Sequence, residues 1–426
     1  MKLRRRSSAL SRLPRHSIAE TTRKHLNAGQ VEWLLDLEID LVVGHRQGCF
    51  LHDLDRGPYL DAACDGTTFN LGHRHPRLVA KLKESADLWD IGCQFLPSAA
   101  RGALAQELLG SVSPALSVVH FANSGSEANE AAIKAARTAT GREKIVSIRG
   151  GRHGVMGLTG ELTGGALPAP SARAAAGLLQ VGWDDLGAIE SAVQQKDVAA
   201  VMIEAIPADL GWPMPSSGYH AGVRELCTAT GTLLIVDEAQ TGLGRTGKVW
   251  AIDHWNVVPD ILVMAKGASG GLYPLAYCVM SPRAASWMNS HPLSMVSSFA
   301  GSELGCVVGC EVLRMTKDPA FLATVGHAEQ HLAAGLESLA TRFASQIVEV
   351  RQLGLAAALK FADPHGGVLM MSALFKHRVW AVAAAFDLSV IRINPPLIID
   401  PAKLGLLLQA LHDAIVDCWG NSRVHA

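Results

Sequence analysis

The sequence has almost no net charge and no hydrophobic run long enough to cross a membrane. Its 426 residues include 38 basic and 39 acidic side chains, for a formal net charge of −1. Nothing in that balance favours a nucleic acid or an anionic membrane as a partner. No apolar run reaches the roughly 20 residues of a transmembrane helix. We therefore expect neither nucleic acid nor membrane among the partners.

Two further absences indicate a cytoplasmic protein without a structural metal. The eight cysteines contain no C-x-x-C pair and no cysteine–histidine spacing typical of a metal site. Most lie in apolar surroundings, as reduced cysteines of cytosolic proteins do. The segment Met1–Arg15 has five arginines and no acidic residue, but it lacks the apolar stretch of a secretion signal. We expect a disordered basic tail there and a cytoplasmic location.

The order of the predicted elements indicates an α/β protein of two domains. A hydrophobic fraction of 49% and a charged fraction of 18% suit a globular chain with a substantial core. Strands and helices alternate as far as Ser302, which favours a mostly parallel sheet with helical crossovers. Beyond Ser302 helices dominate. We predict an N-terminal tail and arm (residues 1–47), a large domain (48–302) and a smaller α+β C-terminal domain (303–426).

The individual elements follow from apolar runs, helical periodicity and turn residues. Short strands with turns at Gly48 and Gly57 are expected within Val42–Ala62. The strands expected for the large sheet are Val118–Ala122, Lys144–Ile148, Ala199–Ile206, Leu233–Val236, Ile261–Ala265 and Leu275–Ser281. Two more strands are expected at Ile347–Leu353 and Ala356–Phe361. The expected helices are Arg77–Leu88, Leu186–Gln195, Tyr219–Thr230, Glu303–Thr316, His327–Phe343 and Pro401–Trp419.

A buried strand that ends in charge marks the centre of the sequence. Leu233–Val236 is an unbroken apolar run, typical of a parallel strand buried on both faces, and Asp237 follows it directly. After a glycine-rich turn, the strand Ile261–Ala265 ends at Lys266. If the two strands are parallel neighbours, Asp237 and Lys266 emerge at the carboxyl edge of one sheet, where open α/β folds bind ligands.

A lysine and an aspartate at such an edge suit the chemistry of pyridoxal phosphate. This cofactor needs a lysine amine for a Schiff base and a carboxylate that keeps its pyridine nitrogen protonated. The alternative is structural, with Lys266 an exposed residue at a strand end and Asp237 the cap of a loop. The pair alone leaves both interpretations open.

A Gly/Ser loop lies between the strand Val118–Ala122 and the next predicted helix. Ser124 and Glu127 fit a capping box, and alanines recur with helical period after them. Free backbone N–H groups at a helix N-terminus form a good phosphate site. The alternative is that Gly125 only makes the turn and Ser124 only caps the helix.

Five segments, in this order, resemble the class III, ornithine-aminotransferase-like family of pyridoxal-phosphate enzymes. They are YLDAACDGTTFNLGHRHP, FANSGSEANEAAIKAAR, LLIVDEAQTGLGRTGK, PDILVMAKGASGG and IRINPPLII. The resemblance extends from about Gly48 to about Ala414. It implies fold type I, the aspartate-aminotransferase type, and a homodimer with its active sites at the subunit interface.

The resemblance also implies roles for the cofactor site. Lys266 resembles the Schiff-base lysine, whose amine then moves the proton between the substrate Cα and the cofactor C4′. Asp237 matches the carboxylate on the pyridinium nitrogen, and Gln240 matches the donor to the 3-oxygen. Gly125 and Ser126 match the phosphate loop.

Other implied roles concern the substrate and the neighbouring subunit. Arg392 matches the arginine that grips the substrate α-carboxylate. Glu204 matches the conditional partner of a substrate-binding arginine, although Ala205 replaces the proline that commonly follows it. Ser298, in VSSFAGSEL, stands where relatives present a threonine to the phosphate of the neighbouring subunit, although the motif after it differs from the family's.

Arg152, just before His153, is the main departure from the family. The resemblance places both residues beside the cofactor, at a position where relatives stack an aromatic ring. A guanidinium can stack on a π-face or bind an anionic group of the substrate. The alternative is that Arg152 points to solvent or to a surface carboxylate.

The resemblance implies an aminotransferase that moves an amino group between an amino donor and a keto acid or aldehyde through the pyridoxamine form. One alternative is a decarboxylation-dependent transaminase, because DEAQTG and IRINPPL resemble the dialkylglycine decarboxylase branch. A second is an aminomutase of the same family. A third, suggested by Arg152, is a protein that keeps the fold and has lost turnover.

Overall fold

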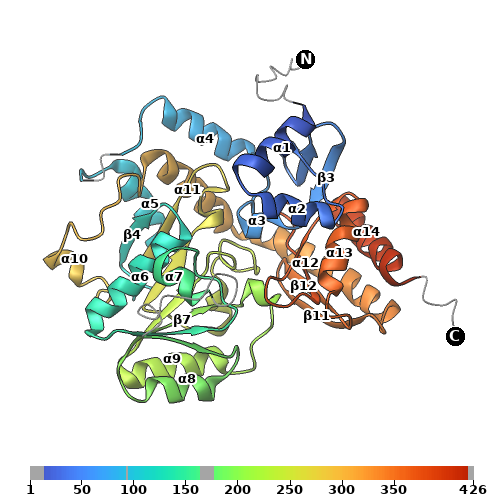
Figure 1. Ribbon diagram of the computed structural model, residues 1–426. Helices are drawn as coiled ribbons and strands as arrows, with labels where there is room; N and C mark the ends of the chain where they lie inside the picture. Colours follow the sequence, from blue (N-terminus) through green and yellow to red (C-terminus); the bar gives the residue numbers. More distant parts are fainter. Residues whose placement is uncertain (1–13, 93–94, 164–176, 421–426) are drawn as a thin grey trace.

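A computed structural model describes residues 14–92, 95–163 and 177–420. Its centre is a seven-stranded sheet with the order β4-β10-β9-β8-β7-β5-β6 (Figure 1). The strands are β4 (Val118–Ala122), β5 (Lys144–Ile148), β6 (Leu178–Val181), β7 (Val198–Glu204), β8 (Leu233–Asp237), β9 (Ile261–Met264) and β10 (Ala276–Met280). Strand β10 runs antiparallel to β9 and β4, and the other neighbours are parallel. The predicted α/β fold with a mainly parallel sheet is confirmed.

Both faces of this sheet are covered, which explains why its central strands are apolar throughout. Successive residues of a strand point to opposite faces. Leu234 belongs to one hydrophobic core and Leu233 to the other. Helix α6 (Gly125–Thr140) covers the second face with a row of buried alanines, as its periodicity predicted. Small side chains let this helix lie close to the sheet, which brings its N-terminus to the edge where β8 ends.

The helices of the large sheet have these bounds. They are α3 (Cys64–Thr67), α4 (Pro76–Ala86), α5 (Ala99–Leu109), α6, α7 (Gly157–Leu162), α8 (Leu186–Val193), α9 (Tyr219–Thr230), α10 (Trp287–Ser290) and α11 (Glu303–Thr316). Short 3₁₀ turns are η2 (Ala208–Leu210), η3 (Ala251–Trp255) and η4 (Lys266–Ser269).

A second sheet belongs to the C-terminal part of the chain. Its order is β11-β12-β15-β14 and all its pairs are antiparallel. The elements are α12 (Pro319–Arg342), β11 (Ile347–Leu353), β12 (Ala356–Phe361), α13 (Gly366–Lys376), β14 (Val382–Ala383), β15 (Val390–Ile393) and α14 (Pro401–Trp419). Helix α12 begins at Pro319 rather than at His327, because Asp318 caps it by accepting a hydrogen bond from the N–H of Ala320 (2.9 Å). The sequence reading missed α13, β14 and β15.

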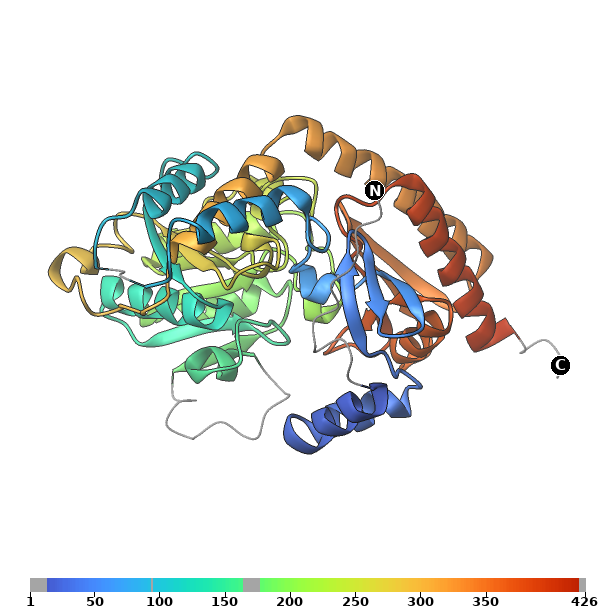
Figure 2. The same cartoon turned by 90° about the horizontal axis from the view of Figure 1, so that it is seen from above.

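A small third sheet joins the two ends of the chain. It contains β1 (Val43–Gln47), β2 (Phe50–Asp53), β3 (Gly57–Asp61) and β13 (Val379–Trp380), in that order. Strand β3 pairs with β13, and both contribute to the hydrophobic core of the C-terminal part (Figure 2). The division at residues 48 and 302 stays a prediction. These contacts place β2 and β3 with the C-terminal segment.

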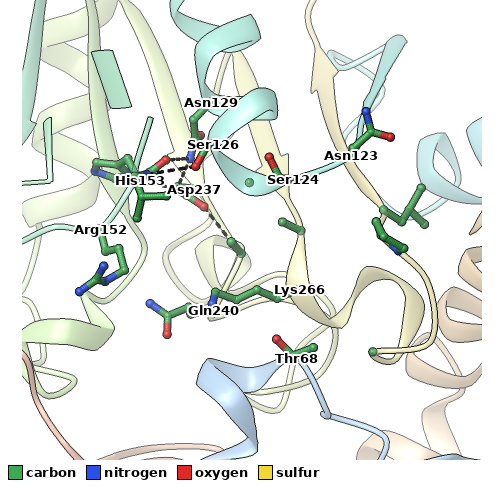
Figure 3. Close-up of a pocket in the computed structure, with 18 of the residues that line it drawn as sticks. Thr68, Asn123, Ser124, Ser126, Asn129, Arg152, His153, Asp237, Gln240 and Lys266 are labelled. Atoms are coloured by element: carbon green, nitrogen blue, oxygen red, sulfur yellow. Dashed lines mark hydrogen bonds and ion pairs between the residues drawn. The ribbon is translucent and has the colours of Figure 1, made fainter. Parts of the chain in front are cut away.

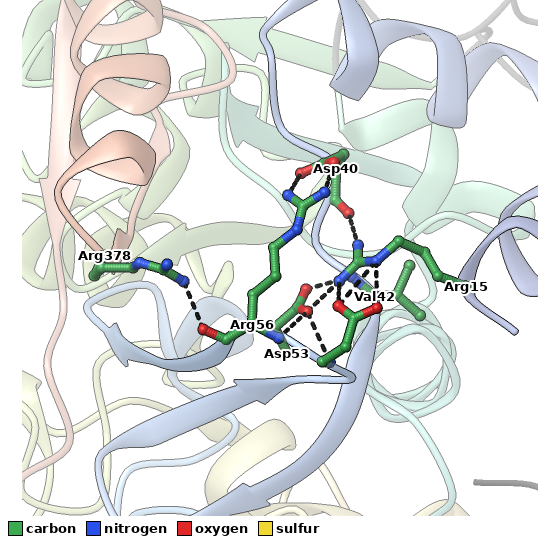
Figure 4. Close-up of polar contacts among 7 residues, drawn as sticks. Arg15, Asp40, Val42, Asp53, Arg56 and Arg378 are labelled. Atoms are coloured by element: carbon green, nitrogen blue, oxygen red, sulfur yellow. Dashed lines mark hydrogen bonds and ion pairs between the residues drawn. The ribbon is translucent and has the colours of Figure 1, made fainter. Parts of the chain in front are cut away.

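Charge pairs tie the N-terminal segment, which contains helices α1 (Arg15–His25) and α2 (Ala28–Asp36), to this third sheet. Arg15 bridges Asp53 and Asp55, and Arg56 forms two hydrogen bonds of 2.6 Å with Asp40 (Figure 4). The expected basic tail lies mostly outside the described residues. Arg15, which we assigned to that tail, instead begins α1 and is held by the buried Asp53.

Within the described ranges, no helix has the length and apolar character needed to cross a bilayer. The described cysteines are all free thiols, and all but Cys418 are buried.

Arg245 connects the large sheet to the C-terminal part from a fully buried position. Its Nη1 donates to the carbonyl oxygens of Leu355 (2.9 Å) and Pro395 (2.7 Å), and its Nε and Nη2 donate to Oδ1 of Asn70. The adjacent Gly354 approaches the backbone at Arg245 closely. A Cβ on Gly354 would lie 2.4 Å from the carbonyl carbon of Thr246.

We predict that Gly354→Ala destabilises the protein more than the matched Gly141→Ala. Both glycines have left-handed backbones (φ 62° and 67°), but a Cβ on Gly141 would meet nothing within 4 Å. Left-handed strain alone costs about 1–2 kcal/mol. At Gly354 the clash adds about 1–3 kcal/mol. The measurement is the free energy of unfolding in urea, and equal losses for the two variants would contradict the close approach.

Candidate active site

A cavity of about 470 Å³ lies where the central strands end at their carboxyl edge (Figure 3). Its wall is built by the loops after β4 and β5 and by the last or following residues of β7, β8 and β9, among them Ser124, Arg152, Glu204, Asp237 and Lys266. Strand β4 shares this edge because it is antiparallel to β10, which is itself antiparallel to β9. The cavity therefore occupies the position that open α/β folds use for ligands.

Asp237 is the buried carboxylate at the centre of the site. It is the last residue of β8, and its Oδ2 accepts hydrogen bonds from Nδ2 of Asn129 (2.7 Å) and from the Nδ1 side of His153 (3.0 Å). Its Oδ1 accepts from the backbone N–H of Ala239 (3.0 Å). These donors fix the carboxylate and compensate its burial. The contact also affects His153. Burial alone would lower the pKa of His153, but the hydrogen bond to Asp237 and the charge of Asp237 outweigh burial and raise that pKa.

Lys266 lines the same cavity as Asp237 and lies two residues beyond the end of β9. Strands β8 and β9 are parallel neighbours, as the sequence reading required for the two side chains to meet. Lys266 adopts an unusual positive φ of 49° at the start of η4, and such backbones cluster at functional sites. Burial is the main cause that lowers the pKa of Lys266, and the positive charges of Arg392 and Arg152 add to the lowering. The negative charges of Asp65 and Asp209 raise the pKa, but they do not cancel this lowering.

The N-terminus of α6 supplies backbone N–H groups to the cavity. The Oγ of Ser124 accepts from the N–H of Glu127 (3.2 Å), and Oε2 of Glu127 accepts from the N–H of Asn123 (2.8 Å). In the described part of the chain, no hydrogen bond occupies the N–H of Gly125 or Ser126. Both open donors therefore stand at the positive end of the helix dipole, which suits an anion.

The side chains of Gln240 and Lys266 lie close to Gly66, a glycine that we did not predict from the sequence to belong to the site. Gly66, in α3, has a left-handed φ of 60°, and a Cβ there would lie 3.1 Å from both Oε1 of Gln240 and Nζ of Lys266. Any larger residue would enter the space beside the lysine amine. The motif YLDAACDGTTFN contains this glycine, so its presence among the matched segments was the available signal.

Two arginines of the site share one buried carboxylate, Asp209 of η2. Its Oδ1 accepts from Nη1 of Arg392 (2.8 Å), and its Oδ2 accepts from Nε of Arg152. Arg152 lines the cavity, whereas Arg392 is buried and is not among the lining residues. The partner of Arg152 is thus neither solvent nor a surface carboxylate, because Asp209 is 3% exposed. Asp209 lies beyond the end of β7, and a charge at that strand end was the signal we overlooked.

Glu204 lies beside this group without an arginine partner of its own among the described residues. Its Oε1 accepts from the backbone N–H of Arg152 (2.9 Å) and its Oε2 from that of Ala208 (3.3 Å). In this structure the carboxylate that occupies Arg392 is therefore Asp209. Burial raises the pKa of Glu204 to about 7.

Ser298 lies apart from the other predicted site residues. It is exposed and is not among the residues that line this cavity. Its expected contact with a neighbouring subunit stays a prediction. Within the described residues, no group of three or more histidine, cysteine or acidic side chains could hold a metal ion.

The comparisons with known proteins agree with one another. The model of the family described as aminotransferase class-III matches residues 36–415. Over 398 residues the chain is 38% identical to an uncharacterized aminotransferase of Archaeoglobus fulgidus, which covers 93% of both chains. It is 32% identical over 379 residues to a putrescine aminotransferase of Pectobacterium atrosepticum, covering 86% of this chain and 80% of the relative.

A solved structure extends this agreement to the whole fold. The taurine:2-oxoglutarate aminotransferase of Bifidobacterium kashiwanohense, in complex with PLP and glutamate, superimposes with a TM-score of 0.83 at 26% identity. The match covers 96% of this chain and 99% of that structure.

We predict that Glu204→Gln changes how stability depends on pH. Burial raises the pKa of Glu204 from 4.5 to about 7, so the native state retains its proton more tightly than the unfolded chain. The free energy of unfolding should therefore fall as pH rises from 4.5 to about 7, and this component should be missing in the variant. Above that range the difference between the two proteins should stay constant.

The measurement is urea unfolding of both proteins across this pH range. Glu190→Gln, on the exposed face of α8, is the control for losing one surface carboxylate. Parallel curves for wild type and Glu204→Gln would contradict the prediction.

Proposed function

The chain belongs to the class III aminotransferase family, and we propose that its cavity transfers an amino group from an amino donor to a keto acid or aldehyde, with Lys266 and Asp237 as the catalytic residues. The family is pyridoxal-phosphate-dependent, and its members act on an amino donor and a keto acceptor. The single observation that carries the proposal is the placement of a lysine amine and a buried carboxylate at one cavity, from two adjacent parallel strands.

The residues of the cavity fit pyridoxal phosphate in three respects. Open N–H groups of Gly125 and Ser126 suit its phosphate. The carboxylate of Asp237 suits its protonated pyridine nitrogen, and Gln240 suits its 3-oxygen. When bound, this cofactor supplies an aldehyde that condenses with amines and a ring that accepts electrons from the substrate Cα.

Lys266 then acts on a proton. Its lowered pKa keeps more of its amine neutral, so Nζ can take the proton from the Cα of the amino donor and return one during the acceptor half-reaction. The open space that Gly66 leaves beside Nζ gives the amine room for this movement.

Asp237 holds a negative charge in a fixed place. Asn129 and His153 keep its Oδ2 in position by hydrogen bonding to it. The charge of a carboxylate fixed here would favour the protonated form of the cofactor's pyridine nitrogen.

The remaining predicted residues divide between the cofactor and the substrate. We assign His153 to the cofactor side, through Asp237. Arg392 and Arg152 are assigned to an anionic group of the substrate, because both guanidinium groups meet at Asp209 beside Lys266. Glu204 is assigned to the same end, where its side-chain Oε1 accepts from the backbone N–H of Arg152 and holds that part of the chain in place.

We also propose that the active protein is a homodimer in which Ser298 reaches the partner's phosphate site. A Cβ on Gly92 would lie 4.0 Å from the carbonyl oxygen of Ser298, so the segments around these residues are neighbours. Together they expose an apolar surface, and surfaces of this kind mark interfaces. Its exposed members are Leu88, Trp89, Ile91, Phe95, Leu96 and Phe299.

Two substitutions test the catalytic assignment. Lys266→Ala should abolish turnover, because it removes the amine that moves the proton. Asp237→Asn should keep the cofactor yet lose about 100-fold or more of the rate, because the charge beside the pyridine nitrogen is gone. The measurement is the absorbance change of the cofactor-loaded proteins on adding amino donors, followed by keto acids and aldehydes.

Borohydride reduction provides the matching chemical readout. It should attach the cofactor covalently to the peptide that contains Lys266 and to no other lysine peptide. Normal turnover by either variant, or a label on a different lysine, would refute the assignment.

Light scattering tests the homodimer. We predict a particle of twice the 45.1 kDa chain mass, and dissociation by Phe299→Asp, which places a charge on the apolar surface. Leu406→Asp, at an exposed position of α14, is the control and should leave the mass unchanged. A wild-type protein of 45.1 kDa in solution would disprove the homodimer.

A further inference from the structure

The short segment Cys64–Thr67, beside Lys266, has an unusual backbone. All four of its residues have a positive φ, from 48° at Asp65 to 74° at Thr67. Only Gly66 is a glycine, and residues with a side chain rarely adopt this conformation. The segment lies against the reactive amine, because a Cβ on Gly66 would lie 3.1 Å from Nζ of Lys266. Strained backbones cluster at functional sites, so the side chains of this segment are candidates for contact with the substrate.

Hydrogen bonds on both sides hold the segment in place. Before it, Oδ1 of Asp61 accepts from two backbone N–H groups, among them that of Cys64 (2.8 Å). After it, Oγ1 of Thr68 donates to the carbonyl oxygen of Asp65 (2.9 Å). Thr68 lines the cavity together with Lys266 (Figure 3). The backbone of Asp65 is therefore fixed at the rim of the cavity.

The carboxylate of Asp65 has no structural partner. Its side chain is exposed, and within the described ranges it makes no hydrogen bond and no ion pair. Its charge nevertheless acts on Lys266. Burial has the largest effect on the pKa of Lys266 and lowers it, and the largest effect of any charge is that of Asp65, which raises it. A free anion thus stands near the amine without a role in holding the fold.

Three further carboxylates line the cavity or act on Lys266, and each already accepts hydrogen bonds. Asp237 accepts from an amide and an imidazole, Asp209 from two guanidinium groups, and Glu204 from two backbone N–H groups. A cationic group that enters the cavity would have to compete with these donors. Among the four carboxylates, Asp65 alone offers unoccupied oxygens.

We propose that Asp65 is a specificity-determining residue that binds a cationic group of the amino donor, remote from the amine that reacts. The proposal rests on the proposed function of this cavity as the substrate site. Asp65 precedes Gly66 and is exposed, so it reaches the outer part of a donor and not the reacting atoms. The favoured donors are compounds with a second ammonium or guanidinium group.

Paired donors test the proposal. Butane-1,4-diamine, pentane-1,5-diamine and hexane-1,6-diamine are each compared with the linear monoamine of the same carbon number, by kcat/KM of the donor half-reaction. For at least one length, wild type should prefer the diamine by about threefold to fivefold, the upper part of the range for ion pairs at exposed sites. The preference should shrink at high salt, which screens an exposed charge.

Two variants separate charge from turn shape. Asp65→Asn removes the charge and keeps the backbone, because asparagine also adopts left-handed conformations. It should lose the preference for diamines and keep its rate with monoamines. Asp65→Gly suits a positive φ as well and should lose the preference too. A variant that retains the preference would show that Asp65 only shapes the turn, and would overturn the proposal.

Asp36→Asn is the matched control. Asp36 is an exposed aspartate at the end of α2 and does not line the cavity. This variant loses the same formal charge and should keep the preference for diamines. Equal loss in Asp36→Asn and Asp65→Asn would show that only the net charge of the protein matters. A wild type that prefers no diamine at any length would also refute the proposal.

Inert probes separate this proposal from the proposed function. Choline and 3,3-dimethylbutan-1-ol have the same shape, differ in charge and have no amine that could react. In ligand-observed NMR titrations of the cofactor-loaded protein, wild type should bind choline about threefold more tightly than the alcohol. Asp65→Asn should bind both alike. Failed aminotransfer with this binding pattern would refute the proposed function alone, whereas equal binding by wild type would refute the role of Asp65.

Discussion

The buried carboxylate of Asp237 is the constraint on which the site depends. A strand buried on both faces cannot end in a charge unless donors meet that charge. Asn129 on α6 and His153 after β5 supply these donors, and the alanine face of α6 lets the helix come near enough. The same approach brings the open N–H groups of α6 to the cavity. The need for donors to Asp237 thus also brings the N-terminus of α6, the proposed phosphate site, to the end of β8.

Charge in the cavity is divided into two separate groups. Around Asp237 the partners are an amide and an imidazole, and around Asp209 they are two guanidinium groups. The charges of the second group influence the pKa of Lys266. This separation places Asp237 on the proposed cofactor side and the two guanidinium groups on the proposed substrate side. The family resemblance describes the first group and, in the second, Arg392. Arg152 departs from the family, and Asp209 was not among the matched residues.

Short sequence patterns predicted those features of the fold that depend on residues close together in the chain. The strand that ends at Asp237, the cap at Ser124 and the alanine period of α6 are all encoded within a few residues. The partners of Arg152 and Arg392 are not, because Asp209 is 57 residues from the first and 183 from the second. The pairing of β3 with β13 joins opposite ends of the chain, and β13 is too short to show a period. The choice between simple and decarboxylating transfer depends on which bond of the substrate Cα stands perpendicular to the cofactor plane. No sequence motif encodes that orientation.

Arg245 has a mechanical consequence. Its guanidinium group is held at once by Asn70 on the large-sheet side and by the carbonyl oxygens of Leu355 and Pro395 on the C-terminal side. Pulling these parts straight apart would strip several buried hydrogen bonds from one charged group, at a cost of several kcal/mol. Leu355 directly precedes β12, and Pro395 lies shortly after Arg392 on β15, which pairs with β12. The same guanidinium group therefore also fixes the ends of the two strands beside Arg392, so that Arg392 is held in place against the large sheet.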